Sequence, residues 1–329
     1  MHRVDTATAV ATPPTQNPAG TQGYFSQGSP TGSPPATVPG QDWFNSVQEE
    51  LVGVILAAGL TPSKANNAQL IAALRALFPS HGKCILNFVS TTSIKLSPLN
   101  GNKLTINGTD QAIPSAGVSI ANTGLTAATL YYIYAYMDAG TMKLEASTTA
   151  HSTDATTGVE IKTGDATRTL VAATYTGAGT PGVFQSGGLT RSWFNDPGFA
   201  SLGTFSADRS TASTSFVELD PEIRVYFFSW NKQVMKVCAD GNSSVTGGST
   251  GTSVGLDGAT SYPGFEATGV VHFNGGPVPI TSKGFLTIES EGVHYATLLG
   301  KNSGGTSVFR SATAGDYAKV YLHVSGRRR

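Results

Sequence analysis

The residues of this chain that could carry chemistry are its histidines and its carboxylates. Three histidines, His272, His294 and His323, fall in segments whose pattern predicts strands near the C-terminus, so a zinc site of three imidazoles is conceivable. Histidines that face solvent or bond locally on strands explain the same pattern, and we expect neither a metal nor a cofactor. No HExxH, GxSxG or phosphate-loop motif occurs in the context that its chemistry needs.

Glycoside hydrolysis is the enzymatic alternative, because it needs two carboxylates on facing walls of a cleft. The chain contains 21 acidic residues, so acids at candidate positions arise without any catalytic role. There is also no internal repeat of the kind that builds a long β-helix of similar rungs. We predict no catalytic residues and no enzyme, with a polysaccharide depolymerase as the alternative. Its candidate acids are Asp220, Glu222, Asp240, Asp257 and Glu266.

Aromatic side chains beside polar loops suit sugar binding. Tyr262 and Phe265 flank a Pro-Gly turn at the end of a Gly/Ser/Thr-rich stretch, 240–264, which the composition predicts to be the longest loop of the chain. These two residues are the candidate receptor-binding residues. Packing beneath that loop is the alternative role for both.

Charge and cysteine content exclude several classes of protein. Lys plus Arg and Asp plus Glu both number 21, so the formal net charge is zero and there is no basic footprint for nucleic acid or an anionic membrane. Binding by so neutral a chain is expected to vary little with salt. Cys84 and Cys238 are far apart and predict neither a disulfide framework nor a zinc site. The longest apolar run, 51–60, is too short to insert across a bilayer.

The elements that position these residues begin with a segment rich in proline and glycine, 1–40. Such a composition sustains neither a helix nor a central strand, so we predict an extended arm that becomes ordered only against other subunits. Tyr24 and Phe25 are unusual in a linker and are candidates for anchoring the arm on a partner.

Residues 41–80 are predicted to form a short helical hairpin. Asp42 is the expected N-cap of the first helix, and Gly59 is expected to end it. Thr61-Pro62 is predicted to start the second helix, which Pro79 ends. The apolar stripes of the two helices need cover, either from each other or from copies in neighbouring chains.

The pattern then changes to a period of two, which predicts a small antiparallel β domain over 81–180. Hairpins are predicted at Asn100-Gly101, at 138–140 after a tyrosine-rich strand, and at Gly164-Asp165. A connector, 181–203, follows. Residues 204–329 are predicted to form a β-sandwich or jelly-roll domain. Its expected strands are 216–219, 223–230, 233–239, 269–273, 285–290, 293–299 and 318–324.

The N-terminal quarter resembles the corresponding region of tail-fibre and baseplate-associated proteins of tailed bacteriophages. Four sequence segments carry the resemblance, in this order: Met1-His2-Arg3-Val4-Asp5-Thr6, Asp42-Trp43-Phe44-Asn45-Ser46-Val47-Gln48-Glu49-Glu50-Leu51, Ala58-Gly59-Leu60-Thr61-Pro62-Ser63-Lys64 and Asn66-Asn67-Ala68-Gln69-Leu70. The resemblance implies a virion protein that attaches to the phage tail or baseplate by its N-terminal region and carries β-rich distal domains.

From this resemblance we expect a homotrimer whose partners are tail or baseplate proteins and a bacterial surface receptor, either glycan or protein. Trp43 and Phe44 join Tyr24 and Phe25 as candidate attachment residues, because they lie at the first turn of the first helix beside the arm. Synthesis in the host cytoplasm, without membrane insertion, is expected. A purely structural decoration of the tail and a tailspike depolymerase remain alternatives.

Overall fold

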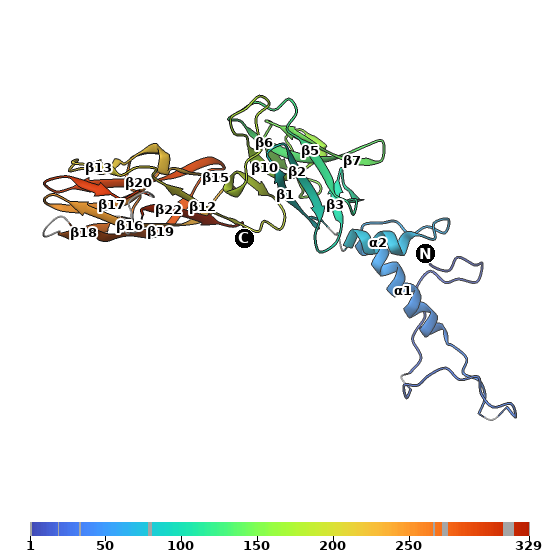
Figure 1. Cartoon of the computed structure of the whole chain (residues 1–329). Coiled ribbons are helices and arrows are strands. Elements are labelled where there is room, and N and C mark those ends of the chain that lie inside the picture. The colour runs from blue at the N-terminus through green and yellow to red at the C-terminus, as the bar shows by residue number, and fades with distance from the viewer. Residues whose placement is uncertain are drawn as a thin grey trace. The chain divides into compact units, whose positions relative to one another are not determined.

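The structure is a computed structural model that describes residues 2–18, 20–32, 34–77, 81–265, 267–271, 276–311 and 319–328, with only the backbone described for Arg75 and for 267–271. The chain divides into two compact units, 1–80 and 81–329. Figure 1 shows helices in the first unit and strands throughout the second. The predicted fold class is confirmed: the protein is mainly β, with short N-terminal helices and several antiparallel sheets.

Unit 1 contains two helices, α1 (Gln41–Ala57) and α2 (Gln69–Leu77). Val52, Ile55 and Ala73 are fully buried, so the two helices pack together within one chain. The predicted end of α1 is confirmed, because Gly59 has a φ of 73° and the cap hydrogen bonds of a Schellman-type C-terminus are present. No helix among the described residues is both long enough and apolar enough to pass through a bilayer.

The first helix begins two residues earlier than predicted, with its N-cap at residue 40 instead of residue 42. Gly40 is the N-cap, and no side chain caps the helix. The Asp42 carboxylate instead accepts a hydrogen bond from the backbone N–H of Asn17, at 2.9 Å. The predicted capping residue therefore ties the arm to the helix.

The predicted start of the second helix at Thr61-Pro62 is wrong. The Gln69 side chain donates to the Thr61 carbonyl at 2.6 Å and accepts from the Ser63 N–H at 2.7 Å. These bonds hold 61–68 as a loop, so α2 begins only at Gln69. Pro79, which was predicted to end this helix, lies outside the described residues.

The first part of unit 2 contains three sheets around one core. Their strand orders are β1-β2-β5, β3-β4 and β7-β6-β10-β9-β8, with β11 beside β10. Cys84, Leu104 and Val171, from different sheets, are all fully buried in this core. The strands are β1 (Cys84–Ser90), β2 (Ser93–Pro98), β3 (Lys103–Ile106), β4 (Thr109–Ala112), β5 (Val118–Ala121), β6 (Leu130–Asp138), β7 (Thr141–Ser147), β8 (His151–Thr153), β9 (Glu160–Lys162), β10 (Asp165–Tyr175) and β11 (Thr190–Ser192).

Two of the three predicted hairpins are confirmed. β6 pairs with β7 across 138–140, and β9 pairs with β10 across Gly164-Asp165. The hairpin predicted at Asn100-Gly101 is wrong: the turn is present, but β2 pairs with β1 and β5, whereas β3 pairs with β4. Leu96 on β2 and Leu104 on β3 are both fully buried in one core, so the two strands face each other across this core from different sheets and do not pair.

The second part of unit 2 is a β-sandwich of two antiparallel sheets, whose strands run along a common direction in Figure 1. One sheet has the order β12-β22-β16-β21-β13 with β19 beside β16, and the other has the order β14-β20-β17-β18 with β15 beside β20. Side chains of both sheets, such as Phe227 and Met235, share one core. The elements are η1 (Gly187–Leu189), β12 (Phe199–Thr204), β13 (Arg209–Thr211), β14 (Val217–Glu218), η2 (Pro221–Ile223), β15 (Val225–Ser229), β16 (Gln233–Val245), β17 (Ser249–Leu256), β18 (Ala267–Val271), β19 (Val278–Ile288), β20 (Gly292–Asn302), β21 (Ser307–Phe309) and β22 (Tyr321–Gly326).

Two segments that lacked a strand pattern contain strands. The connector 181–203 includes β11, which pairs with β10, and most of β12, which pairs with β22. The prediction of a long loop at 240–264 is wrong, because this stretch contains the second half of β16 and all of β17. Many of its small polar side chains are buried, and those of Ser243 and Ser253 are completely so. The predicted strands 269–273 and 318–324 match β18 and β22 in part; residues 272, 273 and 318 lie outside the described residues.

Candidate functional site

The residues predicted to attach the chain to a particle lie at the surface of unit 1. The exposed fraction is 98% for Tyr24, 55% for Phe25, 48% for Trp43 and 57% for Phe44. Phe25 and Phe44 each contact the Trp43 ring edge-on, with ring centroids 5.3 and 5.2 Å from it. The fold thus gathers Phe25, Trp43 and Phe44 into an exposed group, called the aromatic cluster below.

Exposed ion pairs hold the arm beside the helices of unit 1. The Arg3 guanidinium donates two hydrogen bonds to Glu49, at 2.6 and 2.7 Å, and the Lys64 ammonium lies 2.9 Å from the Asp5 carboxylate. The hydrogen bond from Lys64 lowers the pKa of Asp5, and that from Arg3 lowers the pKa of Glu49. Because solvent screens such pairs, they add little stability, and a partner surface can replace them readily.

The two residues predicted to bind a receptor differ in exposure. Tyr262 is half-buried against the sandwich core, and its hydroxyl accepts a hydrogen bond from the Thr287 N–H at 3.1 Å. Phe265 is 2% exposed within that core. The exposed phenylalanine ring expected from the sequence is therefore absent, and Phe265 packs as the alternative had it. A receptor role for Tyr262 stays a prediction.

The candidate catalytic acids are paired at separate places. Asp220 and Glu222 both bond the Arg209 guanidinium, at 2.7 and 2.8 Å. Asp257 contacts the His294 imidazole at 2.6 Å, and this contact raises the pKa of His294. These pairs stabilise loops of the sandwich and do not place two carboxylates across a cleft.

Of the remaining acid and histidine candidates, the structure describes Asp240 and His323. Asp240 accepts a hydrogen bond from the Thr281 hydroxyl at 2.6 Å, and His323 lies on β22. Glu266 and His272 lie outside the described residues. Within the described part of the chain, no three metal-ligating side chains are grouped closely enough to hold an ion.

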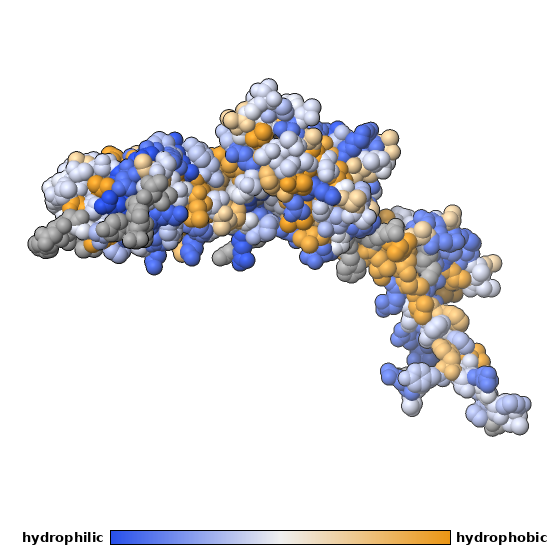
Figure 2. All heavy atoms as spheres, viewed as in Figure 1, coloured by the Kyte–Doolittle hydropathy of each residue, from blue (hydrophilic) through white to orange (hydrophobic). Residues whose placement is uncertain are grey.

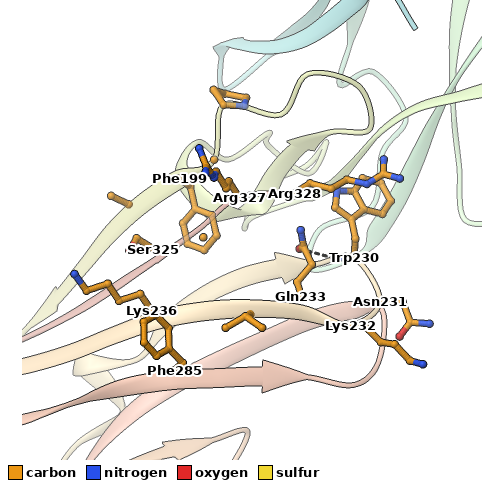
Figure 3. Close-up of a pocket in the computed structure, with 15 residues that line it drawn as sticks. Phe199, Trp230, Asn231, Lys232, Gln233, Lys236, Phe285, Ser325, Arg327 and Arg328 are labelled. Carbon is orange, nitrogen blue, oxygen red and sulfur yellow. Dashed lines mark hydrogen bonds between the residues drawn. The ribbon is translucent and has the colours of Figure 1, made fainter. Parts of the chain in front are cut away.

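A cleft of about 970 Å³ opens on the outer face of the six-stranded sheet. Its lining comes from the start of β12, the β15–β16 turn, β19 and the residues after β22 (Figure 3). Strand alternation places Val234, Lys236 and Phe285 on this outer face, while Met235 points into the core. Sequence reasoning missed this cleft, because four separate segments of the chain contribute to it.

The lining of the cleft is basic. It contains Lys232, Lys236, Arg327 and Arg328 and no acidic residue. Arg328 lies over the Trp193 ring, with its guanidinium carbon 3.1 Å from the ring centroid, and burial lowers the pKa of Arg328 to about 10. The cleft therefore concentrates positive charge on a chain whose formal net charge is zero.

Two buried N–H donors border the cleft. Trp230 and Gln233 are 2% and 7% exposed. The indole Nε1 of Trp230 and the amide Nε2 of Gln233 have no hydrogen-bond partner among the described residues. The other end of the Gln233 amide is fixed, since its Oε1 accepts from the Trp230 backbone N–H at 2.9 Å (Figure 3). An unmatched buried donor costs about 1–3 kcal/mol, so a ligand acceptor that reaches either group is favoured there.

A buried polar junction adjoins the cleft and joins the two β-rich parts of unit 2. His151 contacts Glu160 and, at 3.1 Å, Glu291, which also accepts a hydrogen bond from the Tyr132 hydroxyl at 2.6 Å. Burial opposes the charged imidazole, but hydrogen bonds to Glu291 and Glu160 together outweigh it and raise the pKa of His151. Trp230 borders both the cleft and this junction.

No protein-family model matches the chain, but part of it is similar to two curated proteins. An uncharacterized protein, StfP, of Escherichia coli (strain K12) is 42% identical over 80 residues, which are 24% of this chain and 36% of that protein. Tail fiber protein S of Escherichia phage Mu is 37% identical over 67 residues, which are 20% of this chain and 13% of that protein. The chain thus matches well under half the length of these relatives.

Solved structures are similar only at a low level. A β-porphyranase of glycoside hydrolase family 86 from the human gut bacterium Bacteroides plebeius gives a TM-score of 0.24 at 11% identity, covering 77% of this chain and 38% of that one. Infectious bursal disease virus, Gt strain, gives 0.25 at 10% identity, covering 63% and 58%. Neither value carries an argument about fold or activity. The sequence similarity supports a tail-fibre-like protein over part of the chain.

Proposed function

We propose that this chain is a structural protein of a phage tail fibre, located in the virion tail, which attaches through residues 1–80 and meets the host through residues 204–329. The observation that carries the proposal is the similarity of part of the chain to Tail fiber protein S of phage Mu. The paired carboxylates described above add no support for an enzyme.

The aromatic cluster is the proposed attachment surface. Trp43 and Phe44 are each about half exposed at the start of α1, and Phe25 brings the arm to the same place. Tryptophan and other aromatic residues in such positions commonly carry most of the binding energy of an interface. Burial of these rings by a tail or baseplate protein would remove apolar surface from water, which favours association.

Self-association through unit 1 is part of the proposal. Leu56, Ile71 and Leu74 on the two helices are 50%, 48% and 39% exposed. Figure 2 shows hydrophobic side chains gathered over these helices. Since the pair of helices does not cover its own apolar residues, we propose that copies of the chain do so in a homotrimer. Light scattering of the full chain should give three times the mass of 34.0 kDa.

Attachment is tested with phage particles that carry the double variant Trp43→Ala, Phe44→Ala. Incorporation should fall at least tenfold, because both rings leave the proposed interface. The matched control is Val89→Ala, which also removes an exposed apolar side chain, 57% exposed, but from β1. Normal incorporation of the double variant would remove the attachment role from the aromatic cluster.

Host recognition is tested with the purified full chain. It should bind host cells and compete with phage adsorption, and host polysaccharide should keep its length. A chain that is incorporated but does not compete would be a purely structural tail component. Shortened polysaccharide would instead support a depolymerase.

A further inference from the structure

We propose that the basic cleft of the β-sandwich, between Phe199 and Phe285, binds an acidic oligosaccharide, that is, sugar rings that carry carboxylate or phosphate groups. The proposal deepens the host-recognition role and rests on it for its biological setting. It assigns the ligand to a cleft on the side of the sandwich, rather than to the Tyr262 region that the sequence singled out.

Charge defines the first property of the ligand. Four cationic side chains line the cleft, and no carboxylate does. An acidic ligand would therefore be attracted by the lining, whereas a neutral ligand would gain nothing from its charge. Lys232 and Lys236 are exposed and their ammonium groups can follow an anion, whereas Arg328 is held over Trp193. This local charge reverses the expectation from the neutral composition: binding here should weaken as salt screens the lysines.

Aromatic surface defines the second property. Phe285 is 67% exposed and lies directly across the strand pair from Lys236, so an apolar ring and an ammonium group stand side by side. Figure 3 shows Phe285 and Lys236 together at one end of the cleft, with the Gln233 amide further along. A sugar ring has apolar C–H faces for such a phenyl group and carries its acid at the ring edge. An isolated phosphate ion would use the ammonium group alone.

The size of the cleft and its buried donors define the third property. A volume of about 970 Å³ lies at the upper end of small-molecule sites, which run from about 300 to 1,000 Å³, and exceeds what one anion fills. Trp230 and Gln233, whose unmatched N–H groups are buried, line the same cleft. Hydroxyl and ring oxygens of a saccharide supply the acceptors that these donors lack. Cations, aromatic faces and neutral donors together fit an acidic oligosaccharide of more than one ring.

The test is isothermal titration of the full chain with trigalacturonate, with its fully methyl-esterified form and with inorganic phosphate. The panel also includes a phosphate-bearing trisaccharide. At least one acidic trisaccharide should bind, the neutral ester should bind at least tenfold more weakly, and phosphate should not displace the sugar at equal concentration. The affinity for the acidic sugar should fall when the salt concentration rises from 0.05 to about 0.3 M.

Two variants separate the charge from the ring. Lys236→Gln should weaken binding about fivefold, the effect of one solvent-exposed ion pair at its upper limit. Phe285→Ala should weaken it by a similar factor, and the two changes together should weaken it about 25-fold, because independent effects add in free energy. The matched controls are Lys319→Gln, which removes another exposed lysine, and Leu202→Ala, whose side chain is 65% exposed on β12 of the same sheet; neither residue lines the cleft. All four variants change exposed side chains, so circular dichroism should show the fold unaltered.

Several outcomes would overturn the proposal. They are no binding of any acidic trisaccharide, equal binding of the neutral ester, equal displacement by phosphate, which would mean an adventitious ion only, or unchanged binding in both Lys236→Gln and Phe285→Ala. Adsorption separates this proposal from the function on which it rests. A chain that binds the acidic sugar but does not compete for host cells keeps the cleft as a saccharide site and loses host recognition, and the reverse result moves recognition to another surface.

Discussion

The tripeptide Trp-Phe-Asn occurs twice in this chain, at 43–45 and at 193–195, and the two copies have different surroundings. In unit 1 the Trp43 and Phe44 rings are about half exposed on α1. In unit 2 the Trp193 ring packs edge-on against Trp230, with centroids 4.8 Å apart. The Asn195 amide donates to two backbone carbonyls of the first β part, at 3.0 and 2.8 Å. The copy in unit 2 is thus packed against the rest of its unit, whereas the rings of the copy in unit 1 remain about half exposed.

Backbone conformation and neighbours explain this difference. The second copy follows β11 and turns at Asn195, whose φ is 50°, so its side chains point in different directions. Phe194 then covers Gly82, where a Cβ atom would stand 2.3 Å from the ring. On α1 the successive side chains project outward around a regular helix, and the arm residue Phe25 contacts the Trp43 ring. The same three residues therefore form a packed contact within the chain in unit 2, whereas in unit 1 the two aromatic rings stay about half exposed.

The two units also differ in how deeply their ion pairs are buried, and this difference gives the largest expected effect on the free energy of unfolding. The Arg191 and Asp196 side chains are 1% and 2% exposed and form an ion pair in unit 2, whereas Arg3 and Glu49 of unit 1 form theirs at 57% and 43% exposure. Asp196→Asn leaves a buried guanidinium without its counter-charge and should lower the free energy of unfolding by about 3–5 kcal/mol. Urea unfolding of the full chain, followed by circular dichroism, measures the change.

The exposed pair supplies the control for this experiment. Glu49→Gln should leave the urea midpoint of the β signal where it is, because solvent screens that pair. Adding Arg191→Gln to Asp196→Asn should recover part of the loss, since the stranded charge is then removed. Equal effects of Asp196→Asn and Glu49→Gln would show that burial does not distinguish the two units.

The tryptophans of the two copies give the next largest difference. Trp193→Ala removes ring contacts to Trp230 and to the Arg328 guanidinium and should cost about 3 kcal/mol, because the joint between the two β parts loses its centre. Trp43→Ala should change the unfolding of the full chain by less than about 0.5 kcal/mol, as an exposed substitution does. Thermal melting of both variants checks this. A large loss in Trp43→Ala would mean that the aromatic cluster is a core and not an open surface.

The sequence predicted local features of the fold better than contacts between distant segments. Local signals succeeded: Gly59 ends α1, and the turn at 138–140 joins β6 to β7, because both depend on residues with positive φ. Pairing across distance failed at Asn100-Gly101, since the turn fixes a reversal but not which sheet the next strand joins. Composition failed at 240–264, where small polar residues fill the interior of a sandwich by bonding one another, as Thr250 and Ser307 do at 2.7 Å.

The candidate site was predicted less well than the fold. The residues of the aromatic cluster were selected from the sequence because Trp43 and Phe44 lie on one helical turn and Phe25 is unusual in a linker. The basic cleft was not found, because a lysine at 236 or an arginine at 328 gives no local signal that they share a surface. Global composition was misleading as well, since a net charge of zero hides a lining with four cations and no acid.

The polar junction gives a smaller, pH-dependent difference. The pKa of His151 is raised in the folded chain, so its contribution is complete below the usual value of 6.5 and is lost as pH rises through the raised value. Burial opposes the charged form of Glu291, but hydrogen bonds from His151 and Tyr132 together outweigh it and lower the pKa of Glu291, so its charge persists below 4.5. The ion pair is therefore complete between roughly pH 5 and 6.5 and weakens on the alkaline side.

Unfolding of the wild type and of His151→Gln at pH 6 and pH 9 measures this contribution. The wild type should lose more free energy of unfolding than the variant between the two pH values, because its imidazole loses the proton that the raised pKa retains in the folded chain. Other titrating groups are common to both proteins and cancel in the difference. The matched variant in unit 1 is His2→Gln, whose imidazole lies 3.6 Å from Asp5 in an exposed pair and should leave the profile unchanged. If the difference in free energy of unfolding between the wild type and His151→Gln is the same at pH 6 and pH 9, the junction does not bind a proton on folding.

Tyr262 gives the smallest expected effect and tests the half-buried candidate against the exposed one. Its hydroxyl bonds the Thr287 backbone, accepting from the N–H at 3.1 Å and donating to the carbonyl at 3.3 Å, on the edge of the sandwich. Tyr262→Phe keeps the ring and removes both bonds, so it should lower the free energy of unfolding by about 0.5–1 kcal/mol. Tyr24→Phe, at 98% exposure in the arm, should cost nothing measurable. If Tyr262→Phe leaves stability unchanged but weakens host binding, the hydroxyl of Tyr262 belongs to the receptor surface. If the variant lowers stability and leaves host binding intact, Tyr262 is a structural residue. The basic cleft is then the better candidate for recognition.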